Sequence, residues 1–263
     1  MTFKQQLEQL STILTRAGRE IIMPAYARSV QTTSKADGSV VTETDLACQH
    51  FIEHELLKID PMIGFLGEEM SQEEQLSCLQ QGGGTFWCLD PLDGTTNFAT
   101  AFPSFSISLA LIRNGHAELA CIHDPVRSET FTACLSGGAS LNGQPIRCSE
   151  ESVLSNSVGF IDFKRLQREI ACRLATEKIY RSQRNVGSCA LEWAWLAAGR
   201  GQFIIHGGEK LWDFAAGSLL ASEAGCCVGD FSATDLFPTS SLSSPILATC
   251  SRSLQDELKQ QLR

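Results

Sequence analysis

The sequence lacks the features of membrane, secreted and nucleic-acid-binding proteins. No apolar run approaches the roughly 18 residues of a membrane-spanning helix, and residues 1–6 do not begin a secretory leader, which joins a basic segment to an apolar core. Its 30 acidic residues outnumber the 21 basic ones, the net charge is −9, and no three basic residues are consecutive. We therefore expect a cytoplasmic protein that binds neither a membrane nor nucleic acid.

Cysteine is abundant, but its spacing does not suggest a disulfide framework. The 11 cysteines include no C-x-x-C pair, and Cys226 and Cys227 are adjacent. Without a secretory leader we expect reduced thiols, because disulfides persist mainly in oxidising compartments. We predict that most of these side chains are buried as small apolar groups.

The order of apolar runs predicts a mixed α/β (α+β) fold. No internal repeat or long linker divides the chain, so we expect a single domain over 1–263. Its first lobe would span about 1–148 and its second about 149–263. The expected helices are 4–28, 45–59, 162–175, 188–198, 213–224 and 252–261. The expected strands are 63–66, 86–89, 105–112, 117–122 and 129–134, with a hairpin turn at 113–116. The expected loops are 29–41 and the polar stretch that ends at 82–84.

Carboxylates gather in three short segments at predicted strand ends or helix starts. These are Gly67-Glu68-Glu69, Asp90-Pro91-Leu92-Asp93-Gly94-Thr95-Thr96-Asn97-Phe98 and Trp212-Asp213-Phe214-Ala215-Ala216-Gly217. In the second segment Pro91 stiffens the chain and Gly94 permits a sharp turn. Asp90 and Asp93 would point to opposite faces of a regular strand, but in a tight turn they can converge on one centre.

The chemistry of these segments points to a metal and a phosphate. Oxygen-only ligands suit Mg²⁺, Mn²⁺ or Ca²⁺ and not zinc. An acidic protein would repel a phosphorylated metabolite unless bound metal ions inverted the local field. Paired ions can hold both the attacking and the leaving oxygen in phosphoryl chemistry. Residues 95–97 also suit the first turn of a helix, whose N–H groups can bind a phosphate.

The segment from Asp90 to Phe98 resembles the signature of the inositol monophosphatase family, part of a lithium-sensitive, Mg²⁺-dependent phosphatase superfamily. Gly67-Glu68-Glu69 is similar to its upstream metal motif, residues 212–217 to its downstream motif, and Lys35 with Thr42-Glu43-Thr44-Asp45 to the loop and helix that come first. All four occur in family order at close to family spacing. The resemblance implies a five-layer α-β-α-β-α sandwich with a mostly antiparallel first sheet and a mixed second sheet, and it implies a homodimer.

The resemblance also implies a role for each matching residue. The implied metal ligands are Glu68, Asp90, the Leu92 carbonyl, Asp93 and Asp213, which would hold two or three Mg²⁺ ions, with Mn²⁺ as a substitute. Thr95 would orient the attacking water, with Glu68 or Asp45 as proton acceptor. The N–H groups of Gly94 and Thr95 would hold the phosphate. The monoester would be attacked in line by metal-activated water without a covalent intermediate, and Li⁺ would inhibit.

The chain departs from the family at the expected substrate contacts. Gly187-Ser188-Cys189-Ala190 resembles the family's Gly-Thr-Ala-Ala segment, whose backbone approaches the substrate. Where the animal inositol enzymes have a Glu that contacts inositol hydroxyls, this chain has His206. A Glu accepts two hydrogen bonds, whereas a neutral His accepts one and donates one. We predict an inositol monophosphate or a related sugar phosphate as substrate, and Lys35 is either a solvated loop residue or a gate for metal or water.

Several alternatives stay open. Thr96-Asn97-Phe98 lies on the inositol and fructose-1,6-bisphosphatase side of the superfamily, whereas the segment from Lys35 to Thr42 resembles the 3′-phosphoadenosine 5′-phosphate phosphatases. Either bisphosphate could be the substrate of the same metal site. A non-catalytic phosphate-binding protein would keep the fold without turnover. Residues 50–54 match the H-x-x-E-H pattern of zinc peptidases, but the apolar face of a helix explains their spacing equally well.

Overall fold

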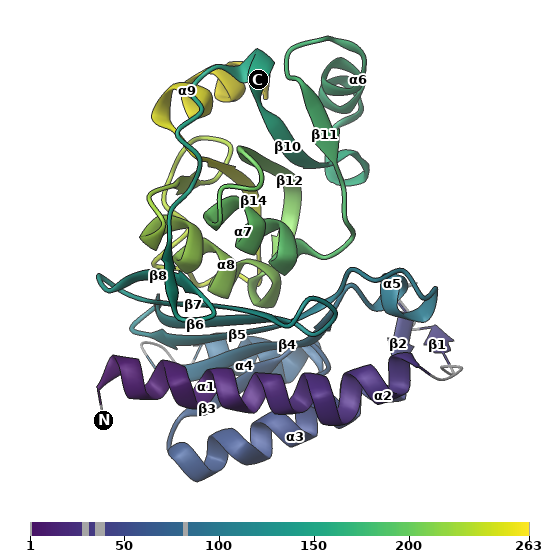
Figure 1. Ribbon diagram of the computed structural model, residues 1–263, viewed down its shortest axis with the longest axis vertical. Coiled ribbons are helices and arrows are strands. Elements are labelled where there is room, and N and C mark those ends of the chain that lie inside the picture. Colours follow the sequence, from purple (N-terminus) through teal and green to yellow (C-terminus); the bar gives the residue numbers. More distant parts are fainter. Residues whose placement is uncertain (1, 28–31, 35–39, 81–83, 263) are drawn as a thin grey trace.

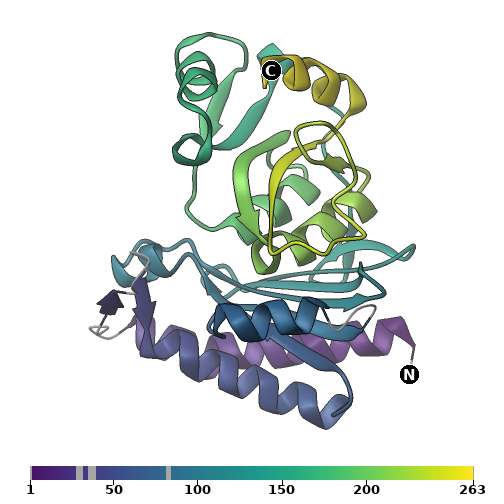
Figure 2. The same ribbon diagram turned by 180° about the vertical axis from the view of Figure 1, so that it is seen from behind.

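The computed structural model describes residues 2–27, 32–34, 40–80 and 84–262. In this part of the chain, helices and two large sheets stack as five layers, with helices outside and between the sheets (Figure 1). The view from behind shows the same stack, with the two ends of the chain far apart (Figure 2). The mixed α/β class and the layered sandwich implied by the resemblance are confirmed.

The first sheet has its strands in chain order. They are β3 (Gly64–Gly67), β4 (Thr85–Asp93), β5 (Ser106–Arg113), β6 (His116–Asp124), β7 (Glu129–Cys134), β8 (Gly138–Leu141) and β9 (Gln144–Ile146). β3 is parallel to β4, and the other neighbours pair antiparallel. Asn114 and Gly115 both have positive φ, as the tightest hairpin turns require, so the hairpin expected at 113–116 is confirmed.

The second sheet is mixed, in the order β11-β10-β12-β14-β13. Its strands are β10 (Val158–Asp162), β11 (Ser182–Arg184), β12 (Phe203–Lys210), β13 (Cys227–Gly229) and β14 (Ser243–Thr249). β10 runs parallel to both β11 and β12, and β14 runs antiparallel to β12 and β13. Parallel pairing of β10 with β12 requires a long crossover, which α6 (Arg168–Thr176), β11 and α7 (Cys189–Ala197) supply.

Helices form the outer and middle layers (Figure 1). α1 (Phe3–Ala17) and α3 (Glu43–Ile59) cover one face of the first sheet, α7 and α8 (Leu211–Glu223) lie between the sheets, and α6 and α9 (Arg252–Gln261) cover the second sheet. The shorter elements are the π-helical turn η1 (Gly18–Ile22), α2 (Met23–Tyr26), α4 (Gln72–Gln80), α5 (Thr95–Ala99), the 3₁₀ turns η2 (Leu154–Asn156) and η3 (Phe163–Arg165), and the paired strands β1 (Thr32–Ser34) and β2 (Val40–Thr42).

Strand alternation decides which side chains enter the middle layer. In β4, Cys88 belongs to the core around α7 and α8, and its neighbour Leu89 belongs to the core beneath α1 and α3. In β12, Ile204 belongs to the middle core. Because successive side chains of a strand point to opposite faces, the next residues directed at the middle layer are Asp90 and His206. Both sheets therefore direct polar strand ends toward α7 and α8.

Several predicted elements need correction. The helix predicted over 4–28 is interrupted by η1 just before Pro24, because proline has no N–H to continue the ladder. The polar stretch before residues 82–84 contains α4, whose buried Gln75 donates to the carbonyls of Gly67 and Glu68. The helix predicted over 162–175 begins at Arg168, because β10 extends to Asp162. The loop predicted over 29–41 includes β1 and part of β2.

The cysteines are all free, as predicted. The burial prediction is met in part: Cys48, Cys88, Cys121 and Cys250 are buried, Cys172 is exposed, and the remaining thiols are half-buried. Among the described residues, no helix has the length and apolar character needed to cross a membrane.

Candidate metal centre

Three carboxylates meet in the middle layer. Asp90 and Asp93 of β4 and Asp213 of α8 each place one carboxylate oxygen within 4.8 Å of the other two. Asp90 and Asp93 are buried and Asp213 is half-buried. The strand belongs to the first sheet and the helix follows β12 of the second sheet, so the tertiary fold creates this group.

A register shift in β4 allows Asp90 and Asp93 to act together. Asp90 pairs with Ser108 of β5 and Asp93 pairs with Ser106, so three steps along β4 match two steps along β5. Such an irregularity turns two side chains that are three residues apart to the same side, which regular alternation forbids. The Leu92 N–H donates to Asp90 Oδ1 at 3.0 Å and stabilises this turn.

The start of α7 holds Asp93 in place. Ser188 Oγ donates to Asp93 Oδ2 at 2.5 Å, Cys189 N–H donates to Oδ1 at 3.2 Å, and Ala190 N–H donates to Oδ2 at 2.8 Å. The first N–H groups of a helix have no intrahelical acceptor, and negative charge is favourable at this end. The segment predicted to approach the substrate thus contacts the carboxylate group directly through Asp93.

Burial and mutual repulsion destabilise these carboxylates as anions. Burial raises the pKa of Asp90 well above its usual range, and the charges of Glu68, Asp93 and Asp213 raise it further. The pKa of Asp213 is raised well above its usual range by burial and then by Asp93 and Glu68. Burial also raises the pKa of Asp93, although its hydrogen bonds oppose the rise. A bound cation would relieve both the repulsion and the desolvation of these groups.

The implied catalytic residues lie around the end of β4. Thr95 Oγ is 3.2 Å from Asp45 Oδ1 and 3.1 Å from the Leu92 carbonyl oxygen, and both can accept its proton. Asp45 is buried in the first turn of α3. Gly94 has φ of +92°, and a Cβ there would lie 2.9 Å from the Ser104 carbonyl oxygen. The turn from β4 into α5 therefore requires glycine.

Glu68 approaches the same region from the neighbouring strand. It follows β3, and its N–H donates to the Leu89 carbonyl at 3.1 Å. Its side chain is half-buried, and its charge raises the pKa of both Asp90 and Asp213. Glu68 lies outside the group of three carboxylates within 4.8 Å. Lys35, the remaining predicted residue of this region, lies outside the described residues.

His206 lies in a second polar group on the other side of α7. It is buried, its Nδ1 accepts a hydrogen bond from Gly208 N–H at 3.1 Å, and its Nε2 is 3.3 Å from Asp162 Oδ2. Cys189 Sγ, a ring nitrogen of His206 and a carboxylate oxygen of Glu209 lie within 4.8 Å of one another. Glu209 was not predicted from the sequence, although its distance of three residues from His206 repeats the spacing of Asp90 and Asp93.

Gly187 joins the two regions at the entrance to α7. It has φ of +71°, and its carbonyl oxygen would be 3.1 Å from a Cβ on Gly94. Asn97 Nδ2 donates to the carbonyls of Val186 and Ser104, both at 2.7 Å. Asn97 of α5 thereby links the loop before α7 to the segment that precedes β5, next to the turn at Gly94.

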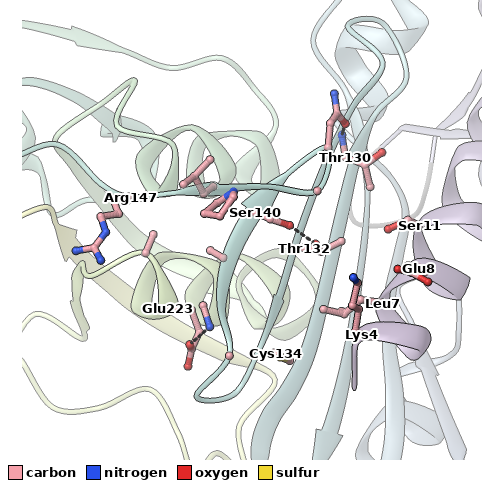
Figure 3. A pocket seen from close by; sticks show the side chains of 18 of the residues that line it. Lys4, Leu7, Glu8, Ser11, Thr130, Thr132, Cys134, Ser140, Arg147 and Glu223 are labelled. Atoms are coloured by element: carbon pink, nitrogen blue, oxygen red, sulfur yellow. Dashed lines mark hydrogen bonds between the residues drawn. The ribbon is translucent and has the colours of Figure 1, made fainter. Parts of the chain in front are cut away.

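Other features are remote from these two groups. His50 and His54 of the zinc-peptidase pattern are exposed on α3 and belong to neither metal-binding group found in the described residues. A surface groove of about 920 Å³ lies between α1 and strands β7 to β9, with Lys4, Thr132 and Glu223 in its lining (Figure 3). None of the predicted site residues lines this groove.

Known proteins resemble this chain over nearly its whole length. A family model described as the inositol monophosphatase family matches residues 4–263. The fructose-1,6-bisphosphatase/inositol-1-monophosphatase of Thermotoga maritima is 37% identical over 227 residues, 83% of this chain and 82% of that protein. The Nus factor SuhB of Salmonella typhimurium is 36% identical over 238 residues, 86% of each chain. A solved IMPase structure from Thermotoga maritima, 31% identical, covers 98% of this chain and 96% of its own, with a TM-score of 0.86.

Proposed function

The chain belongs to the inositol monophosphatase family, and we propose that it hydrolyses a small phosphate monoester with Mg²⁺ held at the Asp90, Asp93 and Asp213 carboxylates. The family resemblance noted in the sequence is confirmed, and the names of relatives such as that of Thermotoga maritima indicate a phosphatase. The observation that carries the proposal is the convergence of these three carboxylates from β4 and α8 within 4.8 Å.

The residues at this centre fit a hard divalent cation. All three donors are carboxylates, and their burial makes the metal-free anions costly, as the raised pKa of Asp90 indicates. We propose that Asp90, Asp93 and Asp213 hold Mg²⁺, with Glu68 and the Leu92 carbonyl as further ligands. Mn²⁺ would substitute because it takes the same oxygen ligands. When bound, the cation would neutralise phosphate charge and lower the pKa of a water molecule.

The side chains around Thr95 would position the nucleophile and accept its proton. Thr95 Oγ can donate its single proton to Asp45 or to the Leu92 carbonyl, which leaves its lone pairs to accept from a water molecule. Asp45 or Glu68 would then accept the proton. N–H groups in the first turn of α5, at Gly94 and Thr95, would bind phosphate oxygens. Positioning by these groups would contribute to the rate.

We propose an inositol monophosphate or a related sugar phosphate as the substrate. The Thermotoga maritima relative is named for both fructose 1,6-bisphosphate and inositol 1-phosphate, so fructose 1,6-bisphosphate is an alternative substrate at the same centre, as is 3′-phosphoadenosine 5′-phosphate. The proposed contacts lie in the segment Gly187-Ser188-Cys189. His206 lies beside Cys189, where its Nδ1 accepts a hydrogen bond from Gly208 N–H and its Nε2 is 3.3 Å from Asp162 Oδ2.

The test is phosphate release with Mg²⁺, with a chelator and with Li⁺. The substrates are inositol 1-phosphate, fructose 1,6-bisphosphate, 3′-phosphoadenosine 5′-phosphate, glycerol 2-phosphate and histidinol phosphate. We expect Mg²⁺-dependent release from one or more of them, and inhibition by Li⁺. Asp90→Asn should lower kcat by about three orders of magnitude, because a lost metal contact removes several kcal/mol of transition-state stabilisation. Asp256→Asn, at an exposed position of α9, is the matched control and should keep full activity.

A folded protein that releases no phosphate from any of these substrates, with Mg²⁺ or Mn²⁺, would contradict the proposal. A non-catalytic phosphate-binding role would then be favoured; the related SuhB of Salmonella typhimurium is named a Nus factor. The homodimer and the cytoplasmic location stay predictions. Sedimentation of the purified protein tests the first, and fractionation of the source cells tests the second.

A further inference from the structure

The polar group of Cys189, His206 and Glu209 has the composition of a transition-metal site. One ligand atom of each residue lies within 4.8 Å of the other two. The side chains of His206 and Glu209 are 4% and 1% exposed, whereas Cys189 is half-buried. The donors are a thiol, an imidazole and a carboxylate, a set that differs from the three carboxylates of the neighbouring centre.

The backbone of β12 brings two of these side chains together. His206 pairs with Ile246 of β14 and Glu209 pairs with Ser244, so three steps along β12 match two along β14. The two side chains therefore share the face directed at α7, where Cys189 is the first residue of the helix. Gly207 makes this possible, because a Cβ there would lie 1.7 Å from the Arg165 carbonyl oxygen.

The carboxylate of Glu209 is incompletely satisfied. Its Oε2 accepts a hydrogen bond from Trp193 Nε1 at 2.7 Å, and Trp193 is itself fixed by close contact with Gly217 of α8. Its Oε1 is buried and has no hydrogen-bond partner among the described residues. A buried carboxylate oxygen without a partner is expensive. Burial raises the pKa of Glu209 to about 8, so either a proton or a coordinated cation would relieve this cost.

His206 already has the outer contact of a metal-binding histidine. Such a histidine usually donates its second ring N–H to a carboxylate, which fixes the ring and raises its basicity. Here Nε2 is 3.3 Å from Asp162 Oδ2, and Asp162 is the register partner of His206 on β10. Coordination through Nδ1 would displace only the hydrogen bond from Gly208 N–H, a loss of modest free energy.

We propose that Cys189, His206 and Glu209 form a binding site for a thiophilic divalent metal of the Zn²⁺ type. Thiolate and imidazole ligands select such metals over Mg²⁺, and three protein ligands would leave a fourth tetrahedral position for a water molecule or another ligand. Binding would replace the thiol proton of Cys189, which passes to solvent, with the metal. Metal binding at this site would not require phosphatase activity. Cys189 also belongs to the proposed substrate-contacting segment, and its N–H donates to Asp93 of the acidic centre.

The test is Co²⁺ titration of chelator-treated protein in the presence of excess Mg²⁺, which fills the acidic centre. We expect one equivalent of Co²⁺ to bind with a thiolate-to-cobalt charge-transfer absorption, and Zn²⁺ to displace it. Cys189→Ser should abolish this absorption, whereas Cys172→Ser, at an exposed position of α6, should leave it unchanged. Asp90→Asn should also retain it, which separates the site from the Mg²⁺ centre.

A second variant and a direct measurement guard against misfolding of Cys189→Ser. Glu209→Gln keeps an acceptor for Trp193 and should weaken Co²⁺ binding at least about tenfold, by analogy with losses at metal-site contacts. X-ray absorption at the zinc edge of the loaded wild-type protein should detect one sulfur neighbour together with nitrogen and oxygen. An all-oxygen environment, or an unchanged cobalt absorption in folded Cys189→Ser, would overturn the proposal.

Discussion

Strand β4 of the first sheet and strand β12 of the second sheet have the same backbone irregularity. Each carries a pair of polar side chains three residues apart, Asp90 with Asp93 and His206 with Glu209. Each has a register shift between the members of its pair. Each pair points into the layer of α7 and α8. In both sheets, the polar side chains of the candidate centres therefore lie at an irregular strand end and not in a regular part of the strand.

The two pairs differ in how their side chains are satisfied. Both oxygens of Asp93 accept hydrogen bonds from the first turn of α7, whereas Glu209 keeps one oxygen without a partner among the described residues. The backbone also differs, because β4 contains Pro91 and Leu92 between its pair and β12 contains Gly207 and Gly208. The same backbone irregularity can therefore place side chains for a hard, oxygen-only centre or for a softer centre with mixed ligands.

The largest effect should come from the glycines of β12. Gly207→Ala should lower the free energy of unfolding by about 3 kcal/mol, because its Cβ would lie 1.7 Å from the Arg165 carbonyl oxygen. Gly208→Ala is the matched control, since its Cβ would meet Ser243 Oγ at 3.5 Å, an ordinary contact. Urea unfolding measures both. Equal stability of the two variants would contradict the idea that a glycine at 207 is required for the irregular strand.

The same comparison explains what the sequence could and could not predict. Asp90, Asp93 and Asp213 were recognisable because their segments resemble a family signature in order and spacing, and Gly94 because a sharp turn needs a residue without Cβ. The pair at 90 and 93 was expected in a tight turn, and the structure has it in a shifted strand. A tight turn and a register shift both interrupt the alternation of side chains in a regular strand. Asp90 and Asp93 can therefore converge in either geometry.

His206 and Glu209 illustrate the limit of that reasoning. His206 and Glu209 are also three residues apart, on either side of Gly207 and Gly208, but no known motif includes this spacing. Whether the two glycines form a loop or a strand irregularity depends on the contact with Arg165 and on the pairing with β14. The hydrogen bonds of His206 depend on Asp162, which is distant in sequence. Helix α4 was missed for a similar reason, because its buried Gln75 satisfies backbone carbonyls of the β3 end and leaves no apolar pattern.

An intermediate effect is expected at Ser188, which links α7 to the β4 pair. Ser188→Ala removes the hydroxyl that donates to Asp93 Oδ2 at 2.5 Å, and it should weaken Mg²⁺ binding about tenfold, as losses of outer hydrogen bonds to metal ligands do. The cobalt absorption assigned to Cys189 should persist, because the β12 pair does not use this hydroxyl. Calorimetric titration with Mg²⁺ measures the change.

Ser218→Ala is the control for that experiment, because its buried hydroxyl donates to the Ala215 carbonyl within α8 and contacts neither pair. It should leave Mg²⁺ affinity within twofold of the wild type, a difference of roughly 0.4 kcal/mol. If Ser188→Ala weakened cobalt and magnesium binding to the same degree, the two centres could not be treated as separate.

The last effect grows with pH and concerns Glu192, a buried carboxyl group of α7 near both pairs. Burial raises the pKa of Glu192 to about 8, and its Oε1 accepts a hydrogen bond from Val186 N–H at 2.8 Å. Between the ordinary pKa of 4.5 and this raised value, the folded protein keeps the proton that the unfolded chain releases. The contribution of Glu192 to stability is therefore full at acid pH and is lost as pH rises through this window, by at most about 1.4 kcal/mol per pH unit.

Glu192→Gln should remove that loss while it keeps the acceptor for Val186. In chelator-treated protein, the variant and the wild type should differ little in unfolding free energy near pH 5, and the variant should become progressively more stable toward about pH 8. Exposed Glu257→Gln on α9 should follow the wild type throughout. Asp90 and Glu209 are present in all three proteins, so the pH dependence that Asp90 contributes cancels. The remaining difference belongs to Glu192 together with the effect of its charge on the pKa of Glu209. If that difference did not grow with pH, the buried carboxylate of α7 would have to be ionised in the folded state, and α7 would then carry a negative charge between the two pairs instead of a neutral acid.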